Sequence, residues 1–187
     1  MTPREMIDFI IIIGKLKTTY RHCYTEGDRK ESVADHSWRI ALMAMLCEKE
    51  FPDIDMNKVI KMCLIHDFGE AVTGDIPAFN KTEAHEDTED KAITKLLKLL
   101  PAGLDRELTE LFNEMDALET PEAKLCKSLD NMEAIISHNE SDISTWLPLE
   151  YSLNLTYGEE NVQWSEWTKE LKKELSKDTL KKIQDNK

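Results

Sequence analysis

The sequence predicts an all-α protein, and two observations support this prediction. Along most of the chain, apolar residues recur at intervals of three and four, which is the period of a helix with one buried face. Glycine and proline number only six each among 187 residues, whereas a β-sandwich uses both in its many turns. Residues 139–162 are not predicted to be helical, because Pro148, Asn154 and Gly158 indicate a long irregular connection there.

Helix boundaries follow from residues that cap or interrupt the apolar pattern. Ser32 and Asp35 form an N-terminal capping pair before a helix whose apolar positions continue to Phe51. A second helix is expected after Asp55, and Thr-Pro-Glu at 120–122 is a strong start signal for a helix that runs to about residue 137. The same periodicity predicts further helices around residues 93–100, 104–118 and 164–180.

Composition restricts the kinds of partner. The chain carries 24 basic and 37 acidic residues, a net charge of −13, and such a surface repels long nucleic acids, which bind through phosphate neutralisation. A small phosphorylated substrate is compatible with this charge, because a metal ion or a few local cations can reverse the field inside one pocket. We therefore expect no polymeric nucleic acid as a partner.

The expected location follows from hydropathy and cysteine use. No segment approaches the roughly 20 apolar residues that span a membrane, and the apolar run at residues 9–13 lacks the basic start and cleavage site of a secretory signal. Cys47, Cys63 and Cys126 lie among aliphatic residues, where a reduced cysteine behaves as a small core hydrophobe. These observations predict a cytoplasmic protein with no membrane partner.

Histidine and aspartate occur at three places on the apolar side of expected helices. They are His36, the adjacent pair His66 and Asp67, and Asp130. Taken singly, each is more simply a helix cap or a hydrogen-bonded core side chain, although buried carboxylates are rare unless they are paired or bind metal. Together, two imidazoles and two carboxylates from three helices form a plausible site for one transition-metal ion in a groove between helices.

Three motifs surround these residues. Glu-Ser-Val-Ala-Asp-His spans residues 31–36, His-Asp-Phe-Gly-Glu-Ala-Val-Thr-Gly-Asp-Ile-Pro spans 66–77, and Lys-Ser-Leu-Asp spans 127–130. With these motifs the chain resembles the HD-domain superfamily of metal-dependent phosphohydrolases, and within it the branch of 5′-deoxynucleotidases. The resemblance covers roughly residues 5–137. It implies a single HD-domain helical bundle over residues 1–187, in which this core precedes an irregular segment and a terminal helix at 139–187.

The resemblance also implies the metal-binding and catalytic residues. A divalent metal ion would be bound by His36, His66, Asp67 and Asp130. Asp67 would also be catalytic together with Glu70, which matches the family's catalytic glutamate that acts on the metal-activated water. The simpler alternative for Glu70 is an exposed charge at a helix end. The local sequence favours the catalytic role, because Glu70 follows Asp67 by three residues and would share its helix face if the helix continues.

Substrate-binding residues are implied by the same resemblance. Arg21 matches a phosphate-binding arginine, and Lys127 matches a family lysine that could assist it. Asp75 matches the acid that contacts the sugar 3′-hydroxyl and disfavours a ribose 2′-hydroxyl, and the turn predicted at Gly74 would direct it toward the site. His22 departs from the family, which often has tryptophan there, so the packing of base or sugar is expected to differ. The simpler alternatives are a surface arginine at position 21 and an ordinary turn residue at position 75.

Three functional hypotheses follow. The first is release of phosphate from deoxyribonucleoside 5′-monophosphates by a homodimer that uses one divalent ion (manganese, cobalt, iron or zinc). The second is hydrolysis of the alarmone guanosine tetraphosphate, but those relatives follow the histidine-aspartate pair with Glu-Asp, whereas residues 68–71 here read Phe-Gly-Glu-Ala. The third is a non-catalytic module that senses nucleotide or metal, which the presence of all four expected ligands and Glu70 disfavours.

Overall fold

The computed structural model describes residues 1–25 and 28–186, and in these residues the all-α prediction is confirmed. Their only strands form a short antiparallel hairpin of β1 (Tyr20–Tyr24) and β2 (Lys30–Ser32), in which Tyr20 lies opposite Ser32. The hairpin was not predicted from the sequence. Strands this short carry little alternating pattern, and the hairpin depends on its packing at the start of the next helix.

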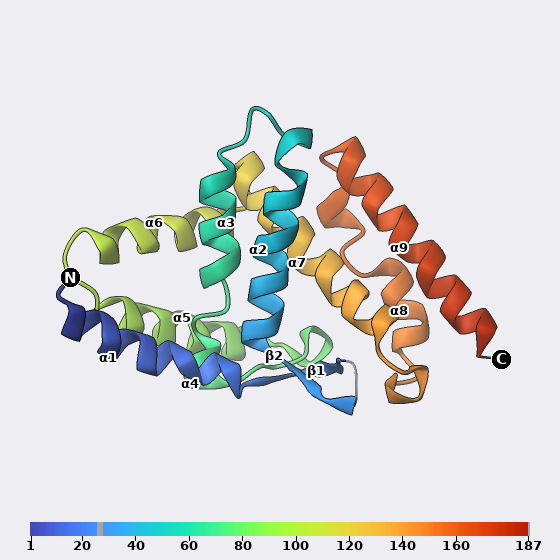
Figure 1. The fold of residues 1–187 in the computed structure, drawn as a ribbon, viewed down its shortest axis with the longest axis horizontal. Coiled ribbons are helices and arrows are strands. Elements are labelled where there is room, and N and C mark those ends of the chain that lie inside the picture. The colour runs from blue at the N-terminus through green and yellow to red at the C-terminus, as the bar shows by residue number, and fades with distance from the viewer. Residues whose placement is uncertain (26–27, 187) are drawn as a thin grey trace.

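Three helices form the centre of the structure. α2 (Val33–Cys47) and α3 (Met56–Ile65) pack side by side, and α7 (Pro121–Glu140) crosses both of them (Figure 1). Ile40, Val59, Leu125 and Leu129 meet in this core and are fully buried. Burial of such side chains contributes about 1.5–3 kcal/mol each, so the core holds the three helices that carry the expected metal ligands.

The predicted helix starts are confirmed by their caps. The Ser32 hydroxyl accepts a hydrogen bond from the Asp35 N–H, and the Asp35 carboxylate accepts one from the Ser32 N–H, so the two form a capping box. Asp55 caps α3 in the same way through the Lys58 N–H. Thr120 caps α7, with Pro121 in the first turn of that helix. These caps satisfy backbone N–H groups that have no partner within a helix.

The other helices extend from the centre in two directions (Figure 1). On one side lie α1 (Pro3–Ile13), α5 (Glu83–Leu97) and α6 (Leu104–Ala117), and on the other lie α8 (Glu150–Thr156) and α9 (Glu166–Asp185). The predicted terminal helix is thus present. Its aromatic residues serve packing, because Phe51 lies 5.6 Å from Trp164 and 5.5 Å from Trp167 between ring centroids.

The prediction of a long irregular connection at 139–162 is wrong in its centre. α7 continues to Glu140, and α8 forms a helix of seven residues between short 3₁₀ turns at Ile143–Thr145 and Glu160–Val162. Pro148 interrupts no helix, because it lies before α8 begins. A helix of two turns is too short for its period to be recognised and is stabilised by tertiary contacts. Among the described residues, no helix has both the length and the hydropathy that crossing a membrane requires.

Candidate active site

The four expected metal ligands lie together at the centre of the structure. His36 comes from α2, His66 and Asp67 from the end of α3 and the turn after it, and Asp130 from α7. His36 Nε2 lies 3.1 Å from Asp130 Oδ1, and His66 Nε2 lies 3.0 Å from Asp67 Oδ2. The distance from His36 Nε2 to Asp67 Oδ2 and the distance from His66 Nε2 to Asp130 Oδ1 are both 3.9 Å. Four donor atoms from three segments thus converge on one point.

Each imidazole is oriented by a hydrogen bond at its other nitrogen. His36 Nδ1–H donates to the Glu133 carboxylate, and His66 Nδ1–H donates to the Cys63 carbonyl oxygen at 3.0 Å. Both Nε2 atoms are therefore directed into the site. His66 Nε2 is buried and has no hydrogen-bond partner, although Asp67 Oδ2 is only 3.0 Å away. This arrangement is typical of ligands arranged around an ion, in which carboxylate and imidazole face a common centre instead of each other.

The charges of the group favour a cation. Burial raises the pKa of Asp67, but His66 outweighs it and brings the pKa to about 2, so the carboxylate is ionised at neutral pH. Burial likewise opposes a charge on His66, yet Asp67 and Asp130 raise its pKa to about 10. The site therefore holds either a proton on His66 or a metal ion in its place. Two imidazole nitrogens and two carboxylate oxygens suit a divalent transition-metal ion.

A turn after α3 brings Glu70 to the site. α3 ends at Ile65, and Glu70 begins the short helix α4 (Glu70–Thr73), so the expectation that one helix continues from His66 to Glu70 is wrong. The turn passes close to α5 at Gly69, where a β-carbon would lie 2.5 Å from Glu89 Cγ. Glycine at position 69 therefore leaves room for the α5 side chains of Glu89 and Ile93.

Glu70 is a buried carboxyl group beside Asp67. Its side chain is 7% exposed, and Oε2 has no hydrogen-bond partner. Burial, with further contributions from Asp67 and Asp75, raises its pKa to about 9. A carboxyl group whose pKa is shifted in this way can hold and release a proton, and a cation bound nearby would favour the ionised form. The alternative of an exposed helix-end charge is therefore wrong.

Arg21 and Asp75 lie side by side in the wall of one cavity. α4 ends before Gly74, whose φ of +80° turns the chain, and the next residue, Asp75, lines the cavity. Arg21 on β1 is largely buried, with Nε 3.4 Å from Glu31 and Nη1 3.7 Å from Glu133. The surface alternative for Arg21 is thus wrong. Burial raises the pKa of Asp75, and Arg21 opposes this increase.

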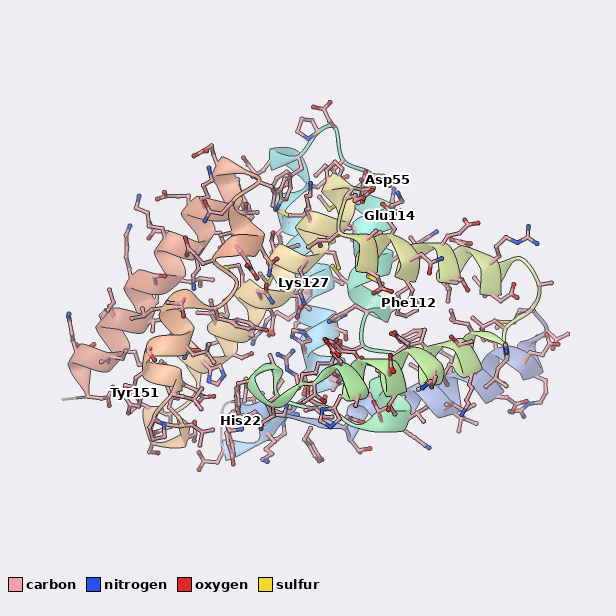
Figure 2. All side chains as sticks on the ribbon, turned by 180° about the vertical axis from the view of Figure 1, so that it is seen from behind. His22, Asp55, Phe112, Glu114, Lys127 and Tyr151 are labelled. Carbon is pink, nitrogen blue, oxygen red and sulfur yellow. The ribbon has the colours of Figure 1, made fainter. Side chains whose placement is uncertain are left out.

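His22 lies further along the same cavity, where β1 meets α8. Its Nε2 is 3.1 Å from Glu150 Oε1, and its ring packs edge-on against Phe79 at 5.9 Å. Figure 2 shows His22 close to the end of the molecule where Tyr151 marks α8, whereas Lys127 lies away from both on α7. Arg21, Asp75 and side chains of α8 therefore share one cavity, while His66, Asp67 and Asp130 line another.

Comparison with known protein families gives a clear result. The family model described as "HD domain" matches residues 13–172 of this chain. The chain belongs to the HD domain family. The motif-based identification is thereby confirmed.

Individual HD proteins are similar to this chain over most of its length. Human "5′-deoxynucleotidase HDDC2" is 36% identical over 142 residues, which cover 73% of this chain and 68% of the relative. Schizosaccharomyces pombe "5′-deoxynucleotidase hdd1" is 31% identical and covers 76% of this chain and 80% of its own. The crystal structure of a predicted metal-dependent phosphohydrolase from Magnetospirillum magnetotacticum superposes with a TM-score of 0.81 at 28% identity, covering 96% of this chain and 93% of the other.

Lys127 lies beside the expected metal ligands and contacts Asp130. Its Nζ is 2.8 Å from Asp130 Oδ2, while the other oxygen of Asp130 is the one directed at His36. The lysine is half exposed and shares a second cavity with His66 and Asp67. Lys127 therefore pairs with the second carboxylate oxygen of Asp130 and is accessible to solvent.

A buried network beside the candidate site was not predicted from the sequence. Glu133 and Glu31 lie between two arginines, Arg21 and Arg39, and the Ser137 hydroxyl donates to Glu31 Oε1 at 2.7 Å. Arg39 Nε donates to Glu133 Oε1 at 2.6 Å. One signal was available, because Glu133 follows Asp130 by three residues on α7 and so lies on the same helix face.

Proposed function

We propose that the chain is a metal-dependent phosphohydrolase that releases phosphate from deoxyribonucleoside 5′-monophosphates. The observation that carries this proposal is the convergence of His36, His66, Asp67 and Asp130 on one point, with Glu70 buried beside it. The names of the human and fission-yeast relatives, both 5′-deoxynucleotidases, support this choice of substrate.

The four converging residues would hold one divalent ion, of manganese, cobalt, iron or zinc. Such an ion, when bound, supplies Lewis acidity that lowers the pKa of water towards ~7 and offsets phosphate charge. The fit to the residues rests on His66, whose buried Nε2 has no hydrogen-bond partner, and on the mixed nitrogen and oxygen donors. Asp67 would bind the ion, and its negative charge adds to the effect of burial in raising the pKa of Glu70.

Glu70 would act in proton transfer. It is within reach of the ligand group, because oxygen atoms of Asp67, Glu70 and Glu89 can lie within 4.8 Å of one another. A buried carboxyl group at this position can take a proton from the attacking water and later give one to the leaving oxygen of the nucleoside. The surrounding protein excludes bulk water from Glu70, so the proton passes to the substrate instead of the solvent.

Arg21, Lys127, Asp75 and His22 would bind the substrate. The guanidinium of Arg21 is held by Glu31 and Glu133, so it can bind the phosphate without first being ordered. Lys127, which contacts Asp130, would add a second positive charge near the phosphate. Asp75 would accept a hydrogen bond from the sugar 3′-hydroxyl and leave little room for a 2′-hydroxyl, and His22 would contact the base or sugar.

We also propose a homodimer, a cytoplasmic location and one HD domain over residues 1–187. A dimer is supported by exposed apolar side chains on neighbouring elements, including Ile10 and Ile11 of α1, Trp38 of α2 and Leu64 of α3. A reducing compartment is supported by the four cysteines, all of which are buried and free. Sedimentation of the purified chain measures its oligomeric state directly.

Release of inorganic phosphate from a nucleotide panel tests the proposed function. We expect turnover of deoxyribonucleoside 5′-monophosphates with manganese or cobalt, and none in the presence of a chelator. Hydrolysis of guanosine tetraphosphate alone would replace this proposal with the alarmone hydrolase. No turnover in protein shown by metal analysis to contain the ion would favour the non-catalytic module.

A further inference from the structure

Helix α8 presents two buried polar side chains to the cavity that contains Arg21 and Asp75. Glu150 is 1% exposed and Asn154, one helical turn later, is 3% exposed. Both residues line the cavity, as do Phe79 and Tyr157. The cavity therefore has charged groups at its Arg21 end, aromatic side chains along it, and a carboxylate with an amide at its α8 end.

Glu150 has one oxygen that the protein uses and one that it does not. Oε2 accepts a hydrogen bond from the Leu147 N–H at 2.6 Å, which fixes the carboxylate in place. Oε1 is buried and has no hydrogen-bond partner. His22 Nε2 and His138 Nε2 lie near it, at 3.1 and 3.4 Å, but neither forms a hydrogen bond with it. The free oxygen is therefore a fixed acceptor without a donor.

Asn154 has an unused donor. Its Nδ2 is buried without a hydrogen-bond partner, whereas its backbone carbonyl accepts from Lys172 Nζ at 3.0 Å. Leaving a buried polar group unpaired is destabilising. An unpaired acceptor and an unpaired donor thus lie on one face of a two-turn helix, and one bound group could satisfy both.

The complementary group must carry an N–H donor next to an acceptor atom on a flat ring that fits between aromatic side chains. The hydrogen-bonding edge of a nucleobase has this pattern: adenine, for example, has an amino group at C6 beside the ring nitrogen N1. The position also agrees, because the charged end of the cavity would hold the phosphate and sugar and the α8 end lies beyond it. None of the four expected metal ligands lines this cavity.

We propose that Glu150 and Asn154 recognise the edge of the nucleobase, with Glu150 Oε1 accepting a hydrogen bond from a base N–H and Asn154 Nδ2 donating one to the adjacent acceptor. This inference rests on the proposed nucleotide substrate and adds the part of the site that binds the base. All four bases offer a donor beside an acceptor, so the pair selects nucleotides against phosphate esters that lack such an edge.

Analogues of deoxyadenosine monophosphate that lack one edge group test the proposal. Purine 2′-deoxyriboside 5′-monophosphate lacks the amino donor, and the 1-deaza analogue lacks the N1 acceptor, while both keep the stacking surface. In wild type we expect kcat/KM for each analogue to be at least tenfold lower than for deoxyadenosine monophosphate. Glu150→Gln should reduce the penalty for the first analogue to within threefold, and Asn154→Leu should do so for the second.

Controls separate recognition from folding. Glu160→Gln changes an exposed carboxylate just after α8 and should keep both tenfold penalties. Because Glu150 also accepts from Leu147, the unfolding temperature of each variant is measured, and the ratio between two substrates within one variant cancels any loss of folded protein. Equal kcat/KM values for all three nucleotides in wild type would overturn the proposal.

Failure of the base site and failure of the proposed function give different results. Turnover of all three nucleotides at equal rates would leave the phosphohydrolase in place and remove the base-recognition role. If no nucleotide is turned over, calorimetric titration with 2′-deoxyadenosine and purine 2′-deoxyriboside, which need no hydrolysis, decides the base site. Tighter binding of 2′-deoxyadenosine by wild type, lost in Glu150→Gln, would support it, and equal binding would overturn it.

Discussion

The His36 imidazole donates its Nδ1 proton to the carboxylate of Glu133, a residue 97 positions later in the chain. Both side chains are buried, and the contact leaves His36 Nε2 directed at Asp130. Burial opposes ionisation of Glu133, but His36 and Arg21 outweigh it and hold its pKa well below the usual range. An anionic Glu133 thus orients His36 and increases its basicity toward a metal ion.

Loss of the negative charge at Glu133 should weaken metal binding. Glu133→Gln keeps the shape of the side chain but removes its charge, and groups that orient a ligand histidine change metal affinity about 10–100-fold. The dissociation constant for manganese, measured by calorimetry, should rise accordingly. Glu140→Gln is the matched control, because Glu140 also accepts from Arg39 yet is mostly exposed. Equal affinities in the two variants would contradict the role of Glu133.

Removal of His66 should abolish metal binding. His66→Ala deletes the buried nitrogen that has no hydrogen-bond partner. An ion that binds only the folded state at a hundredfold excess over its dissociation constant stabilises it by about 2.7 kcal/mol. Manganese should therefore raise the unfolding temperature of wild type and of His85→Ala, a variant at an exposed histidine of α5, but not of His66→Ala. Stoichiometric metal in purified His66→Ala would contradict the site.

Substitution of Glu70 should separate catalysis from metal binding. Glu70→Gln retains the volume of the side chain in its buried position but cannot exchange a proton, and general acid–base groups contribute about 10²–10⁴ in rate. We expect kcat to fall by this amount while the metal content stays at the wild-type level. Glu110→Gln, at an exposed position of α6, should behave as wild type. A kcat for Glu70→Gln within twofold of wild type would show that Glu70 takes no part.

Asp75 should determine the preference for deoxyribose. A hydrogen bond to a charged group contributes about 1.5–3 kcal/mol, so Asp75→Asn should lower kcat/KM for a deoxyribonucleotide roughly 10–100-fold. Wild type should prefer that substrate over the ribonucleotide with the same base. Asp87→Asn, on the exposed part of α5, serves as the control. Equal kcat/KM values for both sugars in wild type would remove this role and leave the phosphohydrolase unaffected.

His138 should make the folded protein less stable in mild acid. Burial, with His22 and Arg21, lowers its pKa from 6.5 to about 4. Between pH 4 and 6.5 His138 is therefore mostly protonated in the unfolded chain and mostly neutral in the folded chain. The contribution of His138 to stability is therefore complete above pH 6.5 and is lost as the pH falls toward 4, by about 1.4 kcal/mol per pH unit. The difference in unfolding free energy between wild type and His138→Gln, measured by denaturant unfolding at several pH values, should change with that slope. An NMR titration that places the pKa of His138 near 6.5 would contradict the prediction.

The sequence by itself was enough for the fold class, the family and the four converging residues. Helical period and caps are local properties, so Ser32, Asp55 and Thr120 mark where helices begin without reference to the rest of the chain. The HD family was identified by the resemblance of the three motifs that contain His36, His66 with Asp67, and Asp130, and the family match confirms it. Expected roles for Glu70 and Asp75 likewise followed from their motif.

Only the tertiary structure decided what surrounds these residues. α3 ends at Ile65 and Gly69 then lies against the Glu89 side chain of α5, and the pairing of His36 with Glu133 joins two helices far apart in the chain. The short helix α8 leaves too weak a periodic signal to be predicted, so Glu150 and Asn154 could not be assigned to a cavity beforehand. Such contacts are determined by the packing of distant segments, and a local pattern in the sequence does not record them.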